Sequence, residues 1–203
     1  MNPFLSIWKH PSQTIQYIVD HKTIPYALML IAFSSLASSF MGFADSGFFE
    51  QFPFPLILFL VLFLSLLIGT AGFGLTVVAY TWIGKLLGGS GKMRQMGLAV
   101  AAGTIPTIWT APIGIIALFL YGEQLFATPT NPFGITNMSI GFYILNAVIM
   151  MGISIFSIVV QSKAIGIVHQ FSAWRGFGTL LIFAGIVIFL LLLVVASILA
   201  III

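Results

Sequence analysis

The sequence predicts an all-α integral membrane protein. We expect five transmembrane helices, a cytoplasmic N-terminus, an exported C-terminus and a short amphipathic helix at the membrane surface before the first span. Three observations support this. Of the 203 residues, 60% are hydrophobic and only 5% are charged, whereas a soluble domain carries about 25% charged residues. The charges divide the chain into apolar stretches long enough to cross a bilayer. The basic residues fall in alternate connections, as in a multispan protein. We therefore treat residues 1–203 as one transmembrane domain.

Residues 1–23 precede the first span. Pro11 stands where a helix would start, and Ile15, Ile18 and Val19 then recur on one helical face. This pattern fits an amphipathic helix lying on the cytoplasmic leaflet. A plain helical lead-in to the first span fits it nearly as well.

Five apolar segments can each cross the membrane. They cover residues 24–44, 55–84, 97–121, 139–162 and 177–203. The second segment is longer than the hydrocarbon core requires, so we expect it to tilt or protrude. Apolar residues at helical spacing follow the fourth segment, so its helix is expected to continue out of the membrane before the chain turns.

The orientation follows from charge. All seven Lys and Arg residues lie before the first span, between the second and third, or between the fourth and fifth, and these regions share one side of the membrane. The opposite connections hold Asp45, Glu50 and Glu123 and no basic residue. The positive-inside rule places the basic side in the cytoplasm. The net charge of +3 has this explanation, and no run of Lys and Arg forms a nucleic-acid-binding stripe.

Small residues on the spans are expected to pack helices together, and Gly72 and Gly74 are examples on the second span. Such residues let helix backbones approach closely in lipid. Packing within one chain and association between copies both remain open. Asn146, an amide deep in the fourth span, is expected to hydrogen-bond a neighbouring helix.

The third span contains Pro106 and Pro112, with Thr104, Thr107 and Thr110 nearby. Proline frees a backbone carbonyl that a neighbouring hydroxyl can satisfy, so a kinked helix is predicted. Such a helix could line a substrate path or merely fit its neighbours, and we favour the second interpretation.

Several kinds of chemistry are disfavoured. The spans contain no Asp, Glu, Lys, Arg or His, and proton-coupled pumps usually place such residues in the membrane. The absence of cysteine excludes thiolate nucleophiles and Cys-type metal sites. The three histidines show no ligand spacing. We therefore expect no metal and no cofactor.

Gly88-Gly89-Ser90-Gly91 matches the Gly-x-Ser-Gly motif of intramembrane serine proteases. That chemistry needs a histidine base within hydrogen-bond reach of the serine. His169 is the only histidine on a later segment, and it is expected outside the spans. An ordinary glycine-rich turn is the favoured interpretation, and the protein is not expected to be an enzyme.

The stretch Gly84-Lys85-Leu86-Leu87-Gly88-Gly89-Ser90-Gly91-Lys92, followed by a span bearing Ile105-Pro106, resembles the central signature of the Yip (Ypt-interacting protein) domain family. The opening Asn2-Pro3-Phe4 is similar to the start of the family's prokaryotic branch. The resemblance implies a non-enzymatic membrane protein with five spans, related to transport or trafficking, in a prokaryotic plasma membrane. Eukaryotic members contact prenylated small GTPases. This sequence lacks their long N-terminal region and their Asp-Leu-Tyr-Gly-Pro element, so GTPase binding is not expected to carry over.

These observations favour an adaptor, assembly or accessory factor whose partners are the bilayer, other membrane proteins and, as one open alternative, further copies of itself. The expected contact face is cytoplasmic and comprises Lys85, Gly88, Gly89, Lys92, Arg94, Lys163, His169 and Arg175. The alternative is a small permease or lipid-handling protein that uses the kinked third span. A polar cavity around Thr107, Thr110 and Asn146 would favour the permease, and a closely packed interior would favour the adaptor.

Overall fold

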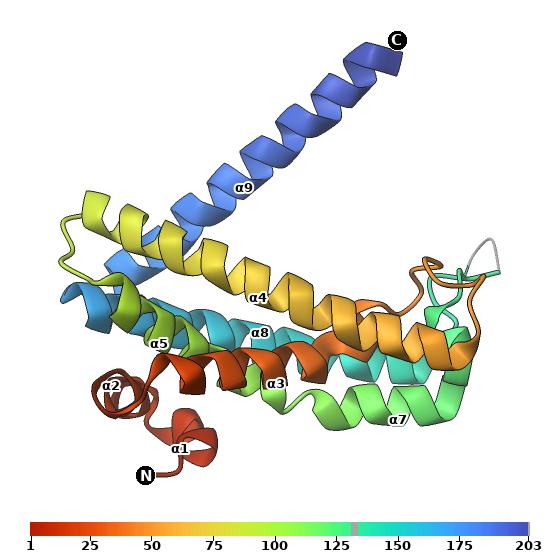
Figure 1. Ribbon diagram of the computed structural model, residues 1–203, viewed down its shortest axis with the longest axis horizontal. Coiled ribbons are helices and arrows are strands. Elements are labelled where there is room, and N and C mark those ends of the chain that lie inside the picture. The colour runs from red at the N-terminus through yellow and green to blue at the C-terminus, as the bar shows by residue number, and fades with distance from the viewer. Residues whose placement is uncertain (131–133, 203) are drawn as a thin grey trace.

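The computed structural model describes residues 1–130 and 134–202, and these residues form helices joined by turns, with no strand among them (Figure 1). Four helices are long and apolar enough to cross a membrane, and a bent helix pair makes a fifth candidate. The four are α3 (Ile24–Gly42), α4 (Phe54–Leu86), α8 (Ile140–His169) and α9 (Ala173–Ile202). The predicted polytopic, all-α membrane architecture is confirmed. Helix α8 also continues past the predicted limit of the fourth span, as expected.

The third span is broken. It consists of α5 (Met93–Gly103), α6 (Ile105–Ile108) and α7 (Ala111–Tyr121), and the 3-10 helix η1 (Gly122–Phe126) follows. The two halves of the span meet at a bend of 44°. Pro106 and Pro112 lie in the first turn of the helices that follow each break, where their missing N–H groups do no harm. Hydroxyl groups supply hydrogen bonds at the breaks, because Thr104 donates to the Ala101 carbonyl at 2.9 Å and Thr110 donates to the Thr107 carbonyl at 2.7 Å. The predicted kink is confirmed.

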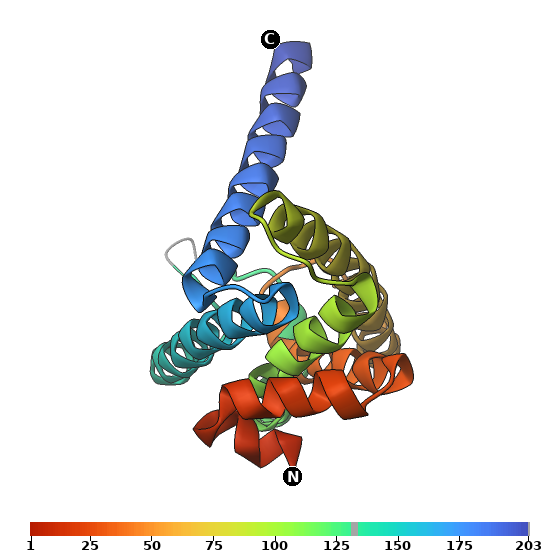
Figure 2. The same cartoon turned by 90° about the vertical axis from the view of Figure 1, so that its left-hand side faces the viewer.

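The N-terminal segment forms two short helices, α1 (Pro3–Lys9) and α2 (Pro11–His21). The predicted amphipathic face exists on α2, and Ile15 and Ile18 are fully buried. That face packs against α5 and α8 and joins the main apolar core. Figure 2 shows α1 and α2 lying across one end of the bundle. The expected helix is therefore present, but its apolar side covers protein and not lipid, because the ends of α5 and α8 offer it an apolar surface.

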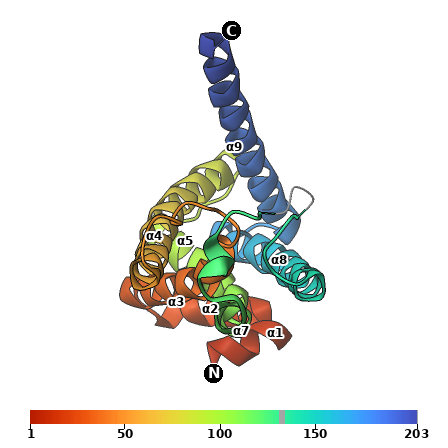
Figure 3. The same ribbon diagram turned by 90° about the vertical axis from the view of Figure 1, so that its right-hand side faces the viewer.

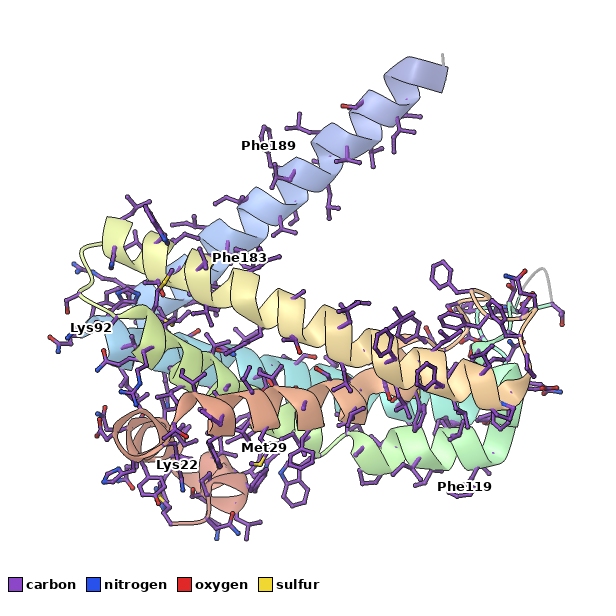
Figure 4. All side chains as sticks on the ribbon, in the orientation of Figure 1. Lys22, Met29, Lys92, Phe119, Phe183 and Phe189 are labelled. Carbon is purple, nitrogen blue, oxygen red and sulfur yellow. The ribbon has the colours of Figure 1, made fainter. Side chains whose placement is uncertain are left out.

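The two ends of the bundle differ in charge. We call the end with all seven Lys and Arg residues the basic end, and Lys22 and Lys92 are labelled there in Figure 4. At the opposite, acidic end, side chains connect the loops. The Asp45 carboxylate accepts the Asn137 backbone N–H at 2.8 Å, and the Glu50 carboxylate accepts the backbone N–H of Thr128.

Helix α9 leaves the bundle. It crosses α8 very closely at Gly176, where an added Cβ atom would lie 2.1 Å from the Ser162 carbonyl oxygen. Near its base, Phe183 meets Tyr80 edge to face at 5.4 Å between ring centroids. Beyond that contact α9 diverges from α4 and α8, and Phe189 lies well away from the other helices (Figures 3 and 4). Its outer part presents apolar side chains on all sides, as expected of a helix surrounded by lipid.

The structure bears on packing within the chain at Gly72, Gly74 and Asn146, and association between copies through the two glycines stays a prediction. A Cβ atom added to Gly72 or Gly74 would meet nothing within 4 Å, so these glycines pack no helix in this chain. Gly69 has that role, since its added Cβ atom would lie 1.9 Å from the Ser35 hydroxyl oxygen of α3. The Asn146 carbonyl oxygen is buried and has no hydrogen-bond partner among the described residues, so the expected bond through that atom is not formed. The reason is the same in all three cases: composition indicated a small or polar residue, but not the direction in which it points.

Candidate functional site

The connection between α4 and α5 is a glycine turn at the basic end. Helix α4 ends at Leu86, and Gly88 then adopts a φ of +87°, a region that favours glycine. The N–H of Gly89 donates to the Gly84 carbonyl at 2.9 Å, which closes the end of the helix. The turn predicted from the Gly-Gly pair is therefore present, and its course is set by backbone hydrogen bonds.

The imidazole of His169 fills the inside of this turn. The Gly91 N–H donates to Nδ1 at 3.1 Å, and Nε2 lies 3.1 Å from the Tyr80 carbonyl oxygen. Since Nδ1 accepts, Nε2 carries the proton and donates it to that carbonyl, so the ring is neutral. The ring stacks on Phe171 at 5.3 Å between centroids, and the side chain is only 2% exposed. His169 thus connects the end of α8 to α4 and to the glycine turn.

Glycine is required around this ring. A Cβ atom added to Gly84 would lie 2.2 Å from Nε2 of His169, and one added to Gly89 would lie 2.3 Å from Nδ1. At Gly91 the nearest atoms would be 2.8 Å and 2.9 Å away, in Val168 and His169. Contacts under about 3 Å force a displacement of the ring. We call Tyr80, Gly84, Gly89, Gly91 and His169 the histidine clasp.

The clasp brings Ser90 next to His169, which the sequence did not lead us to expect. The Ser90 N–H donates to the His169 carbonyl oxygen at 3.3 Å. Both ring nitrogens, however, are already bonded to backbone groups of Gly91 and Tyr80. Neither is free to take a proton from the serine hydroxyl, as a serine nucleophile requires. The geometry is that of a structural histidine.

The expected contact residues divide by exposure. Lys85, Gly88, Lys92, Arg94 and Arg175 are exposed, and Gly89 and Lys163 are half-buried. His169 is a correction: its side chain is buried in the clasp and cannot reach a partner. The sequence predicted that His169 lies at the same end of the bundle as the glycine turn. It did not indicate that the side chain is buried, because nothing in the sequence around a single histidine reveals its burial.

A cavity with a mixed polar and apolar lining lies between the helices and is partly open to the outside. It has a volume of about 330 Å³ and is bounded by α3, α4, α5, α6 and α8. Its polar lining consists of Ser34, Ser35, Ser38, Thr76, Tyr80, Thr104, Thr107 and Gln161. Thr107 is the one residue of the expected permease cavity that lines it. The Thr110 hydroxyl is bonded to backbone carbonyls, and Asn146 is not part of the lining.

Four of these polar residues, Ser34, Ser38, Thr104 and Gln161, already donate to backbone carbonyls. The hydroxyl protons of Ser34 and Ser38 are donated to the carbonyls of Ile31 and Ser34, each at 3.0 Å. The Gln161 amide donates to the Val100 carbonyl at 3.0 Å, while its own carbonyl oxygen is buried without a partner among the described residues. A hydroxyl whose proton is engaged still offers lone pairs. The cavity therefore suits water or another small neutral molecule that forms hydrogen bonds.

Sequence reasoning missed Tyr80, Gly84 and Gln161. Gln161 could have been predicted as a buried polar residue, because a side-chain amide near the end of an apolar helix needs hydrogen-bond partners. Tyr80 contributes its backbone carbonyl to the clasp, and no sequence pattern identifies which carbonyl will accept a bond.

Four or five candidate membrane spans, with a glycine turn between α4 and α5, define a polytopic membrane protein. The sequence model of the Yip1 domain matches residues 5–196, and the chain belongs to the Yip1 domain family. The family is one of non-enzymatic membrane proteins. Comparison with curated proteins and with solved structures gave no match.

Proposed function

We propose that this protein is an adaptor or assembly factor for other membrane components, and that the glycine turn at the basic end is its contact face. One observation carries the proposal: the exposed residues Lys85, Lys92 and Arg94 flank a turn that the buried His169 holds in place. A preorganised loop loses little conformational entropy on binding. Its three positive charges suit a partner with an acidic surface.

The test is affinity capture from membranes solubilised in mild detergent, followed by mass spectrometry. Replacing Lys85, Lys92 and Arg94 together by Ala should reduce capture of the partner at least about tenfold, as expected for loss of several interface charges. Lys9→Ala is the matched control, since it removes a positive charge at the same end but outside the turn. Equal capture by all three proteins would refute the proposal.

The basic end is proposed to face the cytoplasm of a prokaryotic cell, with the C-terminus exported. The support is the distribution of charge described above. The absence of cysteine makes the test direct. Ser90→Cys should resist a membrane-impermeant maleimide in intact cells and react after the cells are opened, and Gln51→Cys should react in both states. The reverse pattern would invert the topology.

A second candidate function, handling of a small neutral polar molecule or lipid, is supported by the hydroxyl-lined cavity. Its volume of about 330 Å³ is within the range of small-molecule sites. Protein reconstituted in liposomes should then accelerate entry of glycerol, and Gln161→Leu should abolish the acceleration. Rates equal to those of empty liposomes would reject this function for glycerol and leave the cavity as a hydrated space.

A further inference from the structure

Lys163 on α8 borders two cavities. The first, about 310 Å³, is lined almost wholly by apolar side chains, among them Ile158, Val159 and Phe177. The second, about 380 Å³, is lined by polar groups of Ser12, Gln16 and Gln170 together with Phe171. Lys163 and Ala173 line both. Because the two cavities share these residues, we treat them together and call them the Lys163 groove, which has an apolar part, a polar part and a lysine that borders both.

The polarity of this groove changes along the membrane normal. Ile158 precedes Lys163 by five residues on α8, a rise of about 7.5 Å toward the middle of the bundle. Phe177 is similarly displaced from Ala173 on α9. Gln170 and Ser12 lie at or beyond Lys163, toward the basic end. A phospholipid has the same order, with acyl chains toward the membrane centre and the phosphate at the surface.

The positive charge of Lys163, which borders both cavities, favours a lipid with an anionic headgroup. Lys163 supplies an ammonium group, and no carboxylate lines either cavity. Asp20, the acidic residue at this end, accepts a hydrogen bond from the Gln16 side chain at 2.9 Å and is not part of the lining. Trp174 borders the apolar part and is 81% exposed, which is the interfacial position that tryptophan prefers in membranes.

We propose that the Lys163 groove binds one anionic phospholipid from the leaflet at the basic end, with the phosphate at Lys163 and an acyl chain between Ile158 and Phe177. The close crossing of α8 and α9 at Gly176 gives the groove a fixed wall. The inference is independent of the adaptor function, because the exposed residues of the glycine turn do not line the groove.

Trp174 provides the assay, since bromine atoms on a bound acyl chain quench tryptophan fluorescence by contact. The protein is reconstituted in phosphatidylcholine vesicles that contain either brominated phosphatidylglycerol or brominated phosphatidylcholine at the same mole fraction. Subtracting the signal of Trp174→Phe isolates this tryptophan from the other three. The anionic lipid should quench Trp174 about fivefold more effectively, the preference expected from one lysine near the surface.

Two variants make the result specific. Lys163→Gln should bring the ratio between the two lipids close to one, and Lys92→Gln, which removes a positive charge outside the groove, should leave it unchanged. Val159→Phe leaves the charge unchanged and places a larger side chain in the apolar part of the groove. Because Val159 is exposed, the larger side chain does not disturb the core, and quenching by the anionic lipid should fall. Equal quenching by both lipids, or the same ratio in Lys163→Gln as in the unsubstituted protein, would overturn the proposal.

Discussion

The histidine clasp allows a matched pair of glycine substitutions on one helix. Gly84→Ala and Gly72→Ala make the same chemical change within α4. Helix propensity favours alanine over glycine by about 1 kcal/mol at both positions. At Gly72 nothing lies within 4 Å of the new methyl group, whereas at Gly84 the methyl group would lie 2.2 Å from Nε2 of His169. Only Gly84→Ala should therefore destabilise the protein.

The magnitude follows from what the imidazole loses. Displacing the ring breaks its hydrogen bonds to the Gly91 N–H and the Tyr80 carbonyl. Each buried group left without a partner costs about 1–3 kcal/mol. After the gain of about 1 kcal/mol in helix propensity, Gly84→Ala should destabilise the protein by about 3 kcal/mol. Gly72→Ala should be neutral or slightly stabilising.

The assay is the free energy of unfolding in mixed micelles, from a titration with sodium dodecyl sulfate followed by tryptophan fluorescence. A double-mutant cycle gives the cause. His169→Ala removes the ring, so adding Gly84→Ala to that variant should cost little, which corresponds to a coupling energy of about 3 kcal/mol. If Gly84→Ala and Gly72→Ala unfold at the same detergent fraction, the imidazole does not pack against Gly84 and the account of the clasp is wrong.

Two further predictions concern the α9 crossing and the acidic end. Gly176→Ala would place a methyl group 2.1 Å from a carbonyl oxygen of α8, so it should destabilise the protein by about 2 kcal/mol. Gly178→Ala should not destabilise it, because nothing lies within 4 Å of the added methyl group. Equal unfolding curves for the two variants would contradict this prediction. At the acidic end, the backbone N–H of Thr128 lowers the pKa of the Glu50 carboxyl below its usual 4.5. A lowered pKa stabilises the folded loops above the ordinary value, and this contribution is lost as the pH falls through the shifted pKa. At each pH, the rate at which pepsin cuts the unsubstituted protein is divided by the rate for Glu50→Gln, which cancels the pH dependence of pepsin itself. This ratio should rise as the pH falls below about 4.5, and the same ratio for Glu123→Gln should rise in the same way.

The sequence by itself determined the class of protein, the presence of several apolar helices long enough to span a membrane, and the break in the helix that carries Pro106 and Pro112. These follow from quantities that depend on local composition: the cost of placing charge in hydrocarbon, the length of an apolar run and the missing N–H of proline. The breaks near Pro106 and Pro112 occur where the sequence predicted a kink. The glycine turn was also predictable, because Gly88 and Gly89 end a helix whatever surrounds them.

Only the tertiary structure decided the direction in which individual residues point. It turned the small residues Gly72 and Gly74 away from the other helices and gave the packing role to Gly69. It brought His169 into a turn about eighty residues earlier in the chain, so a predicted contact residue became a buried structural one. Local composition cannot specify such pairings, because they depend on how helices distant in sequence cross, and the rotation of each helix about its axis is set by packing against its neighbours.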